Sequence, residues 1–169
     1  MEPALKPAAL QTKTKKIGVL ATENTLNSRR FKQTFEKYTN GLEVFVQPGH
    51  GLVELVEQNA QNSDQARQLL TRYLMPMMEK GVDTLVLGCT HYPFLMEMIQ
   101  KVTNNRVTII DPADAVANQA KRLLLQFDLA SDTPHHPLFH FFTTGDKKKT
   151  EAFIDHAVGV PYFLEQIDL

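Results

Sequence analysis

The sequence predicts an α/β protein with a mainly parallel sheet, because apolar strand-like runs alternate with amphipathic helical segments. The clearest run is "VDTLVLGC", Val82 to Cys89, which is apolar almost throughout, as a strand covered on both faces should be. The clearest helix is "SDQARQLLTRYLMPMMEKG", which starts at the capping residue Ser63 and repeats apolar residues every three or four positions. This alternation is typical of βαβ units, whose strands run parallel.

Four strands are predicted before Pro112, and together they form one four-stranded α/β unit. We expect them at Lys15 to Thr22, Leu42 to Pro48, Val82 to Cys89 and Arg106 to Asp111. Helices are expected between them over "NSRRFKQTFEKYTNG", capped by Asn27 or Ser28, and over "LVELVEQN", "SDQARQLLTRYLMPMMEKG" and "PFLMEMIQKV". After Pro112 we expect the helix "PADAVANQAKRLLLQF", one clear strand in "LFHFFTTG" and a final helix "KTEAFIDHAV". The first twelve residues, with Pro3 and Pro7, are interpreted as a linker.

The composition is that of an ordinary water-soluble domain, with 43% hydrophobic and 22% charged residues and a net charge of −1. No broad basic field indicates nucleic-acid binding, and we interpret "DKKKT" as a solvated face or helix start. No apolar run approaches the roughly 18–20 residues that a membrane span needs. The single cysteine excludes an intrachain disulfide framework and indicates the reducing cytoplasm.

That single cysteine, Cys89, follows the most apolar strand in the sequence "GCTHYP". In open α/β sheets ligands bind at the carboxyl ends of strands, and a following helix start would stabilise a thiolate. Cys89 could therefore have a lowered pKa and act as base or nucleophile, with His91 exchanging protons beside it. The alternative is that Cys89 is a small buried residue and His91 a capping or surface histidine.

Other strand ends place polar groups at the same edge. Thr22 and Thr25 could hold a carboxylate through hydroxyls and nearby amides, or could simply cap a helix. Glu57 could bind a ligand ammonium or could be solvated, and Asp111 is best explained as a helix cap. No G-x-G-x-x-G or Walker loop is present, and the pair His135-His136 lacks partners at metal-binding spacing. We therefore predict no metal site.

The segment "LVLGCTHYPFL" resembles the second cysteine motif of glutamate racemases, within the aspartate/glutamate racemase family. The segments "IGVLATENTLNSRRF", "LVELVE", "IIDPADAVA" and "FFTTGD" resemble other parts of the same family. The resemblance implies three parts: an interdomain linker (1–13), the second of two pseudo-symmetric α/β domains (14–111), and a segment returning to the first domain (112–169).

The resemblance further implies a racemase that needs no cofactor and binds glutamate between two domains. Inversion at Cα requires one base on each face of that carbon, and the family uses two cysteines. Cys89 would be the second-domain base, assisted by His91, with Glu57 as an acidic residue near the site. Thr90, Thr22 and Thr25 would bind the polar groups of the substrate.

The first-domain motifs of the family, including its first catalytic cysteine, are not in this sequence. We therefore expect an N-terminally truncated racemase that is weakly active or inactive alone, with the missing half supplied by a partner or with self-association. The alternatives are a non-catalytic binding or regulatory remnant, an enzyme resembling aspartate racemase, and a single-thiol redox or hydrolytic enzyme. The last would need a group that orients His91, which no motif shows.

Overall fold

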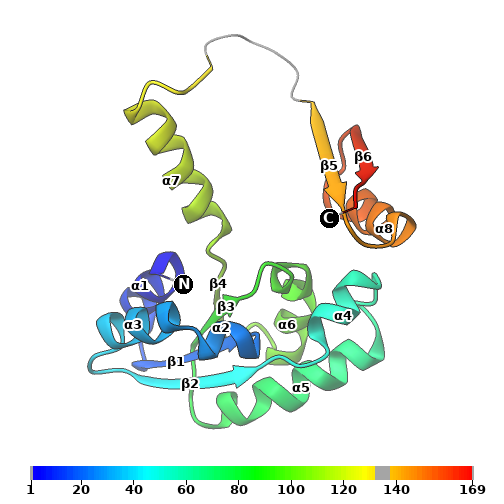
Figure 1. The fold of residues 1–169 in the computed structure, drawn as a ribbon. Coiled ribbons are helices and arrows are strands. Elements are labelled where there is room, and N and C mark those ends of the chain that lie inside the picture. Colours follow the sequence, from blue (N-terminus) through cyan, green and yellow to red (C-terminus); the bar gives the residue numbers. More distant parts are fainter. Residues whose placement is uncertain (1, 132–137, 169) are drawn as a thin grey trace.

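The first part of the chain is a three-layer α/β unit in a computed structural model that describes residues 2–131 and 138–168 (Figure 1). Its sheet has the strand order β2-β1-β3-β4, with every neighbouring pair parallel. The strands are β1 (Lys16–Ala21), β2 (Glu43–Pro48), β3 (Thr84–Gly88) and β4 (Thr108–Ile110). The predicted fold class is therefore confirmed.

Helices cover both faces of this sheet (Figure 1). One layer contains α1 (Glu2–Gln11) and α3 (Arg29–Tyr38), and the other contains α4 (Leu52–Glu57), α5 (Asp64–Glu79) and α6 (Met96–Thr103). The short helix α2 (Glu23–Asn27) follows β1, and the 3₁₀ turn η1 (Tyr92–Leu95) follows β3. Ser28 caps α3 by accepting a 3.1 Å hydrogen bond from the backbone N–H of Phe31.

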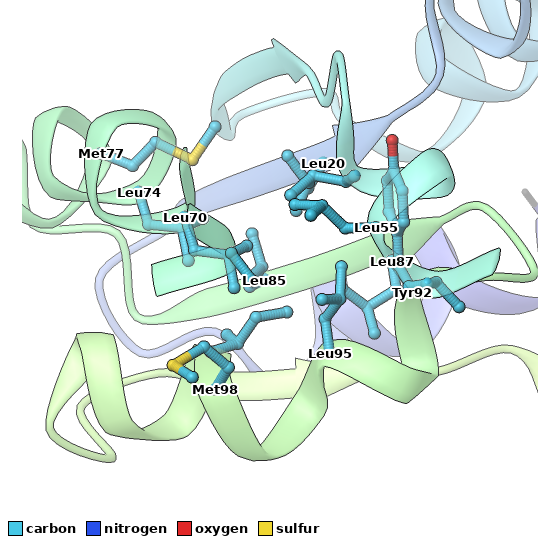
Figure 2. Close-up of a cluster of buried hydrophobic side chains, with 14 of the residues drawn as sticks. Leu20, Leu55, Leu70, Leu74, Met77, Leu85, Leu87, Tyr92, Leu95 and Met98 are labelled. Carbon is cyan, nitrogen blue, oxygen red and sulfur yellow. The ribbon is translucent and has the colours of Figure 1, made fainter. Parts of the chain in front are cut away.

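Two apolar clusters hold the layers together, because successive strand residues point to opposite faces of the sheet. Val19 and Ala21 pack toward α1 and α3, whereas Leu20 packs toward the opposite helices. Leu70 of α5 and Leu87 of β3 belong to the larger cluster, which Figure 2 shows, and both are fully buried. This double cover explains why "LVLG" is apolar at every position.

The segment expected to be a linker is instead helical from Glu2 to Gln11 and packs on the sheet. Ala4, Leu5 and Ala8 are fully buried, so an apolar face outweighs the helix-breaking tendency of Pro7. The residues after this helix contact Asp83, which immediately precedes β3. Asp83 accepts hydrogen bonds from the side chain of Thr12 (2.6 Å) and from the backbone N–H groups of residues 13 and 14. This contact anchors the end of α1 to the sheet.

The C-terminal segment forms a second, smaller sheet. It consists of α7 (Ala113–Gln126), β5 (Phe139–Thr143), α8 (Lys147–Ala157) and β6 (Tyr162–Gln166), with β5 and β6 parallel. Strand β6 was not expected, and it completes a βαβ unit around α8. The predicted helix start at "DKKKT" is confirmed, since Asp146 caps α8. The pair His135-His136 lies outside the described residues.

Within the described ranges, no helix is long and apolar enough to cross a membrane. The same part of the chain contains no group of three or more His, Cys, Asp or Glu side chains arranged to hold a metal ion. The division of the chain after residues 13 and 111 stays a prediction.

Candidate active site

The sheet brings the ends of β1 and β3 together, which places two groups of predicted residues at one edge. Ala21 pairs with Gly88 across the two strands, so Thr22 and Cys89, the next residues along, are neighbours at the carboxyl edge. Glu57 arrives at this edge from the end of α4. The carboxyl ends of these two parallel strands therefore bring Thr22 and Cys89 to the same edge of the sheet.

Cys89, His91 and Glu57 form a continuous chain of polar contacts. The Sγ atom of Cys89 lies 3.8 Å from Nδ1 of His91, and Nε2 of His91 lies 3.3 Å from Oε1 of Glu57. Because a carboxylate only accepts hydrogen bonds, Glu57 favours the tautomer with the proton on Nε2. The lone pair on Nδ1 then faces the thiol, so His91 can accept its proton.

The electrostatics of Cys89 differ from the sequence-based expectation of a lowered pKa. Burial raises the pKa of the Cys89 thiol above its ordinary value, and hydrogen bonds from the backbone N–H groups of His91 and Tyr92 offset this only in part. The expected helix start is the short 3₁₀ turn η1, and the thiol packs against the larger apolar cluster. A helix dipole therefore does not dominate here.

A single-thiol redox or hydrolytic enzyme would need both a group that orients His91 and an activated thiol. The structure does supply a carboxylate beside His91, which the sequence did not reveal. A raised thiol pKa, however, removes the preformed thiolate on which that alternative depends. The same shift suits an acid–base thiol, because the conjugate base of a weaker acid is a stronger base.

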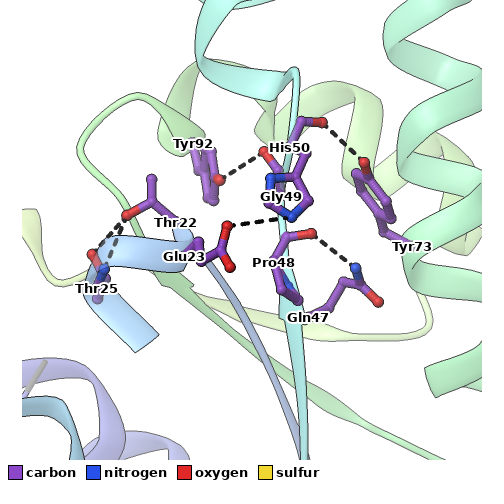
Figure 3. A network of polar contacts seen from close by, with 9 residues as sticks. All are labelled: Thr22, Glu23, Thr25, Gln47, Pro48, Gly49, His50, Tyr73 and Tyr92. Carbon is purple, nitrogen blue, oxygen red and sulfur yellow. Dashed lines mark hydrogen bonds and ion pairs between the residues drawn. The ribbon is translucent and has the colours of Figure 1, made fainter. Parts of the chain in front are cut away.

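Thr22 and Thr25 form a separate pair of hydroxyls, visible in Figure 3. Their Oγ1 atoms are 2.9 Å apart, and Thr22 Oγ1 also accepts a 3.3 Å hydrogen bond from the backbone N–H of Thr25. Thr22 is therefore the cap of α2 while remaining at the site's edge. Thr90 is exposed directly after Cys89. Substrate binding by these three threonines stays a prediction.

The turn after Cys89 is fixed by Tyr92, a residue that sequence reasoning passed over (Figure 3). Its side chain is fully buried, and its hydroxyl donates a 3.1 Å hydrogen bond to the carbonyl of Gly49 at the end of β2. A Cβ atom at Gly49 would lie 2.9 Å from Cζ of the Tyr92 ring, so the close approach requires glycine. The only sign of this role in the sequence is the tyrosine of the "GCTHYP" motif itself.

A cavity of about 620 Å³ has His91 in its lining. It is lined from α4 by residues including Glu54 and Glu57, and from α8 by residues including Lys149 and Phe153. Of the predicted site residues only Glu57 and His91 line it, so it does not contain the thiol or the threonine pair. Cys89 lies at the strand ends, outside the lining of this cavity.

Phe153 is the second residue that sequence reasoning did not connect to the site. Its ring lies 5.9 Å from the His91 ring and 5.6 Å from the Phe94 ring, measured between centroids. The sequence predicts that Phe153 lies in the final helix. The spacing of apolar residues along one helix does not reveal which distant segment that helix contacts.

Comparisons with known proteins identify the class of protein to which this α/β fold belongs. The model of the Asp/Glu/Hydantoin racemase family matches residues 1–120. The chain is 39% identical over its full length to a glutamate racemase of Ralstonia nicotianae, covering 61% of that relative. It is 44% identical to one of Pseudomonas putida over 91% of this chain and 58% of the relative. This chain belongs to the Asp/Glu/Hydantoin racemase family.

Solved structures show the same likeness. Glutamate racemase isoform RacE1 from Bacillus anthracis has a TM-score of 0.85 and 30% identity, covering 99% of this chain and 63% of its own. Glutamate racemase from Francisella tularensis, in complex with D-glutamate, has a TM-score of 0.82 and 26% identity, covering 97% and 62%. The chain therefore spans about three fifths of the length of the relatives it matches.

Proposed function

We propose that this chain supplies the second-domain half of a glutamate racemase that uses no cofactor, with Cys89 as one of its two acid–base thiols. The chain of contacts from Cys89 through His91 to Glu57 carries this proposal. It lies at a sheet edge in a chain that is 39–44% identical to glutamate racemases. D-glutamate bound to the Francisella relative supports glutamate as the substrate over aspartate.

The proposed chemistry is a proton transfer at Cα of glutamate. In one direction His91 takes the Sγ proton of Cys89, and the thiolate then removes the Cα proton from one face. In the other direction the Cys89 thiol returns a proton to the carbanion on that face. Glu57 stabilises the imidazolium that forms, while Thr22, Thr25 and Thr90 bind the polar groups of the substrate.

Inversion also requires a base on the opposite face of Cα. This sequence contains one cysteine, so the second thiol of the two-thiol mechanism would come from residues outside it. We infer that these residues alone exchange the Cα proton without racemising glutamate appreciably. The role we assign is the supply of D-glutamate for peptidoglycan in the cytoplasm, where the thiol stays reduced.

The uncovered C-terminal segment supports a missing half. Parallel sheets in α/β proteins are normally covered on both faces, yet Phe142 and Phe163 are 57% and 59% exposed on the two-stranded sheet. Helix α7 has no buried residue. We propose that a first domain, or a second copy in its place, covers these surfaces.

The test is to incubate the purified chain with L- or D-glutamate in D₂O and to follow the Cα proton by NMR. We expect exchange in one enantiomer without inversion, and no exchange after Cys89→Ala. His91→Asn should slow exchange by about 10²-fold, the scale of general acid–base catalysis. The matched control His140→Asn, on the exposed face of β5, should leave the rate unchanged.

Three results would contradict the proposal. Exchange that survives Cys89→Ala would assign the chemistry to another group. Inversion by the unmodified chain would mean that a second base lies within these residues, and the half-site model would be wrong. Absence of exchange with both enantiomers would contradict the proton transfer assigned to Cys89.

A further inference from the structure

The catalytic-edge residue His91 has few rigid contacts of its own. Its side chain is 27% exposed, and its carboxylate partner Glu57 is 58% exposed, so solvent rather than packing surrounds much of this contact. The 3.8 Å contact to Cys89 is long, and a sulfur partner holds an imidazole weakly. These polar contacts favour one tautomer only while the ring plane is held, and they do not fix that plane themselves.

The ring that does face His91 comes from α8 in the C-terminal segment. Phe153 lies 5.9 Å from His91 with an interplanar angle of 30°, and 5.6 Å from Phe94 in an edge-on arrangement. Distances of this size are those of attractive aromatic pairs. Phe94 follows His91 on the same turn, so Phe153 packs across both residues.

Two polar contacts fix α8 in this position. The Nδ2 atom of Asn59 donates a 3.3 Å hydrogen bond to the carbonyl of Ala152, immediately before Phe153. The side chain of Gln61, whose residue is only 6% exposed, lies 2.7 Å from Nε2 of His156. The His156 ring also lies 6.4 Å from the Phe94 ring. One side of α8 is therefore seated on the turn that carries His91.

We propose that α8 positions His91 for its proton transfer, with Phe153 as the positioning residue and the Gln61–His156 contact holding α8 in place. This inference rests on the proposed function and extends it. His91 is then competent only while a helix from the C-terminal segment is seated on the α4 and η1 side of the site. Movement of that segment would switch the assistance to Cys89 on or off without moving Cys89 itself.

The first test reads the state of the His91 ring and needs no activity. Long-range ¹H–¹⁵N spectra of histidine-labelled protein, at about pH 8 where imidazoles are neutral, report which ring nitrogen carries the proton. In the unmodified chain we expect His91 as the Nε2–H tautomer. Phe153→Ala should give averaged ¹⁵N shifts between the two tautomers, and Phe153→Tyr, which keeps the ring, should restore the single tautomer.

The matched control is Phe163→Ala, which removes an exposed phenylalanine from the outer face of β6. It should leave the His91 signals unchanged. If Phe153→Ala fails to fold by circular dichroism, the exposed His156→Ala replaces it, and it should broaden or shift the same signals. An unchanged His91 tautomer in folded Phe153→Ala, or in His156→Ala if that variant is needed, would overturn the proposal.

A second measurement separates this inference from the proposed function. Deuterium exchange into glutamate should fall by about tenfold in Phe153→Ala, with the half-saturating glutamate concentration unchanged, because misplacing a proton acceptor affects turnover more than binding. An unchanged exchange rate would also overturn it. If the unmodified chain exchanges no proton, the proposed function fails, and the His91 spectra alone decide the role of Phe153.

Discussion

The four-stranded unit and the segment after Pro112 differ in how much of their apolar surface is buried. In the four-stranded unit the sheet is covered on both faces and its central residues, such as Leu20 and Leu87, are fully buried. Among the described residues after Pro112, Ile154 is the only buried hydrophobic residue. Leu125 of α7 and Phe127, the residue that follows this helix, are each 62% exposed. The first region has its own core, whereas the second is a set of formed elements without one.

The contrast between the two regions shows that helices and strands can form in a segment that has no buried core of its own. Helix α7 has an apolar stripe, yet no described partner covers it. Strands β5 and β6 pair in register, but one face of their sheet carries exposed phenylalanines. Apolar surface left in water contributes nothing to stability, so the free energy of unfolding should come almost entirely from the first region.

The largest expected effect tests this contrast with two leucine-to-alanine substitutions. Leu70 is fully buried, with an exposed fraction of 0%. Leu70→Ala should therefore lower the free energy of unfolding by about 2–5 kcal/mol. Leu125 is 62% exposed, and Leu125→Ala should change the free energy of unfolding by less than about 0.5 kcal/mol. Urea denaturation followed by circular dichroism measures both. Equal losses in the two variants would show that α7 is part of a common core.

A smaller effect concerns the anchor between α1 and the sheet at Asp83. Burial raises the pKa of this carboxyl, but hydrogen bonds from Thr12, from the backbone N–H groups of residues 14 and 13, and from Thr84 outweigh it and lower the pKa to about 2. Asp83→Asn should therefore cost about 1–2 kcal/mol at pH 7, after allowance for its solvent exposure.

The pH dependence of this contact follows from the direction of the shift. The folded pKa lies below the ordinary value of 3.8, so the stabilisation is present above that value and is lost as the pH falls toward about 2. The difference in unfolding free energy between the unmodified chain and Asp83→Asn should shrink over this window. The control Asp114→Asn, exposed on α7, should show no such trend. If this free-energy difference stays constant with pH, the ionised Asp83 side chain does not stabilise the contact between α1 and the sheet.

Sequence reasoning worked where local pattern decides structure. The continuous apolar run "LVLG" indicated a central strand, and Ser63 marked the start of α5 correctly. It failed for α1, because Pro3 and Pro7 suggested a linker although Ala4, Leu5 and Ala8 form an apolar face. It also missed β6, whose five residues carry too short an alternation to identify without the partner strand.

The site shows the same division between local and tertiary information. The closeness of His91 to Cys89 follows from their spacing, but the 3.3 Å contact with Glu57 depends on how α4 meets η1. The direction of the Cys89 pKa depends on how much apolar packing surrounds the thiol, which the sequence does not report. The contact with Phe153 joins segments far apart in the chain.

The last contrast between the two regions concerns self-association. Exposed apolar patches favour contact between copies, and the outer face of β5 and β6 presents Phe142 and Phe163 together with the ring of His140. Replacing both phenylalanines by serine should shift the chain toward monomer in sedimentation velocity, with an unfolding free energy changed by less than about 1 kcal/mol. The control Leu10→Ser alters a residue that is 78% exposed but lies on α1 of the first region.

Leu10→Ser should leave the association unchanged, because a single exposed leucine on a covered unit is not a patch. If it reduces association as much as the double substitution does, contact between copies would run through the first region. The same α/β unit would then have both a core and an interface, and the open face of β5 and β6 would need another explanation. If the double substitution alone acts, the exposed face of β5 and β6 is the surface through which copies of the chain meet.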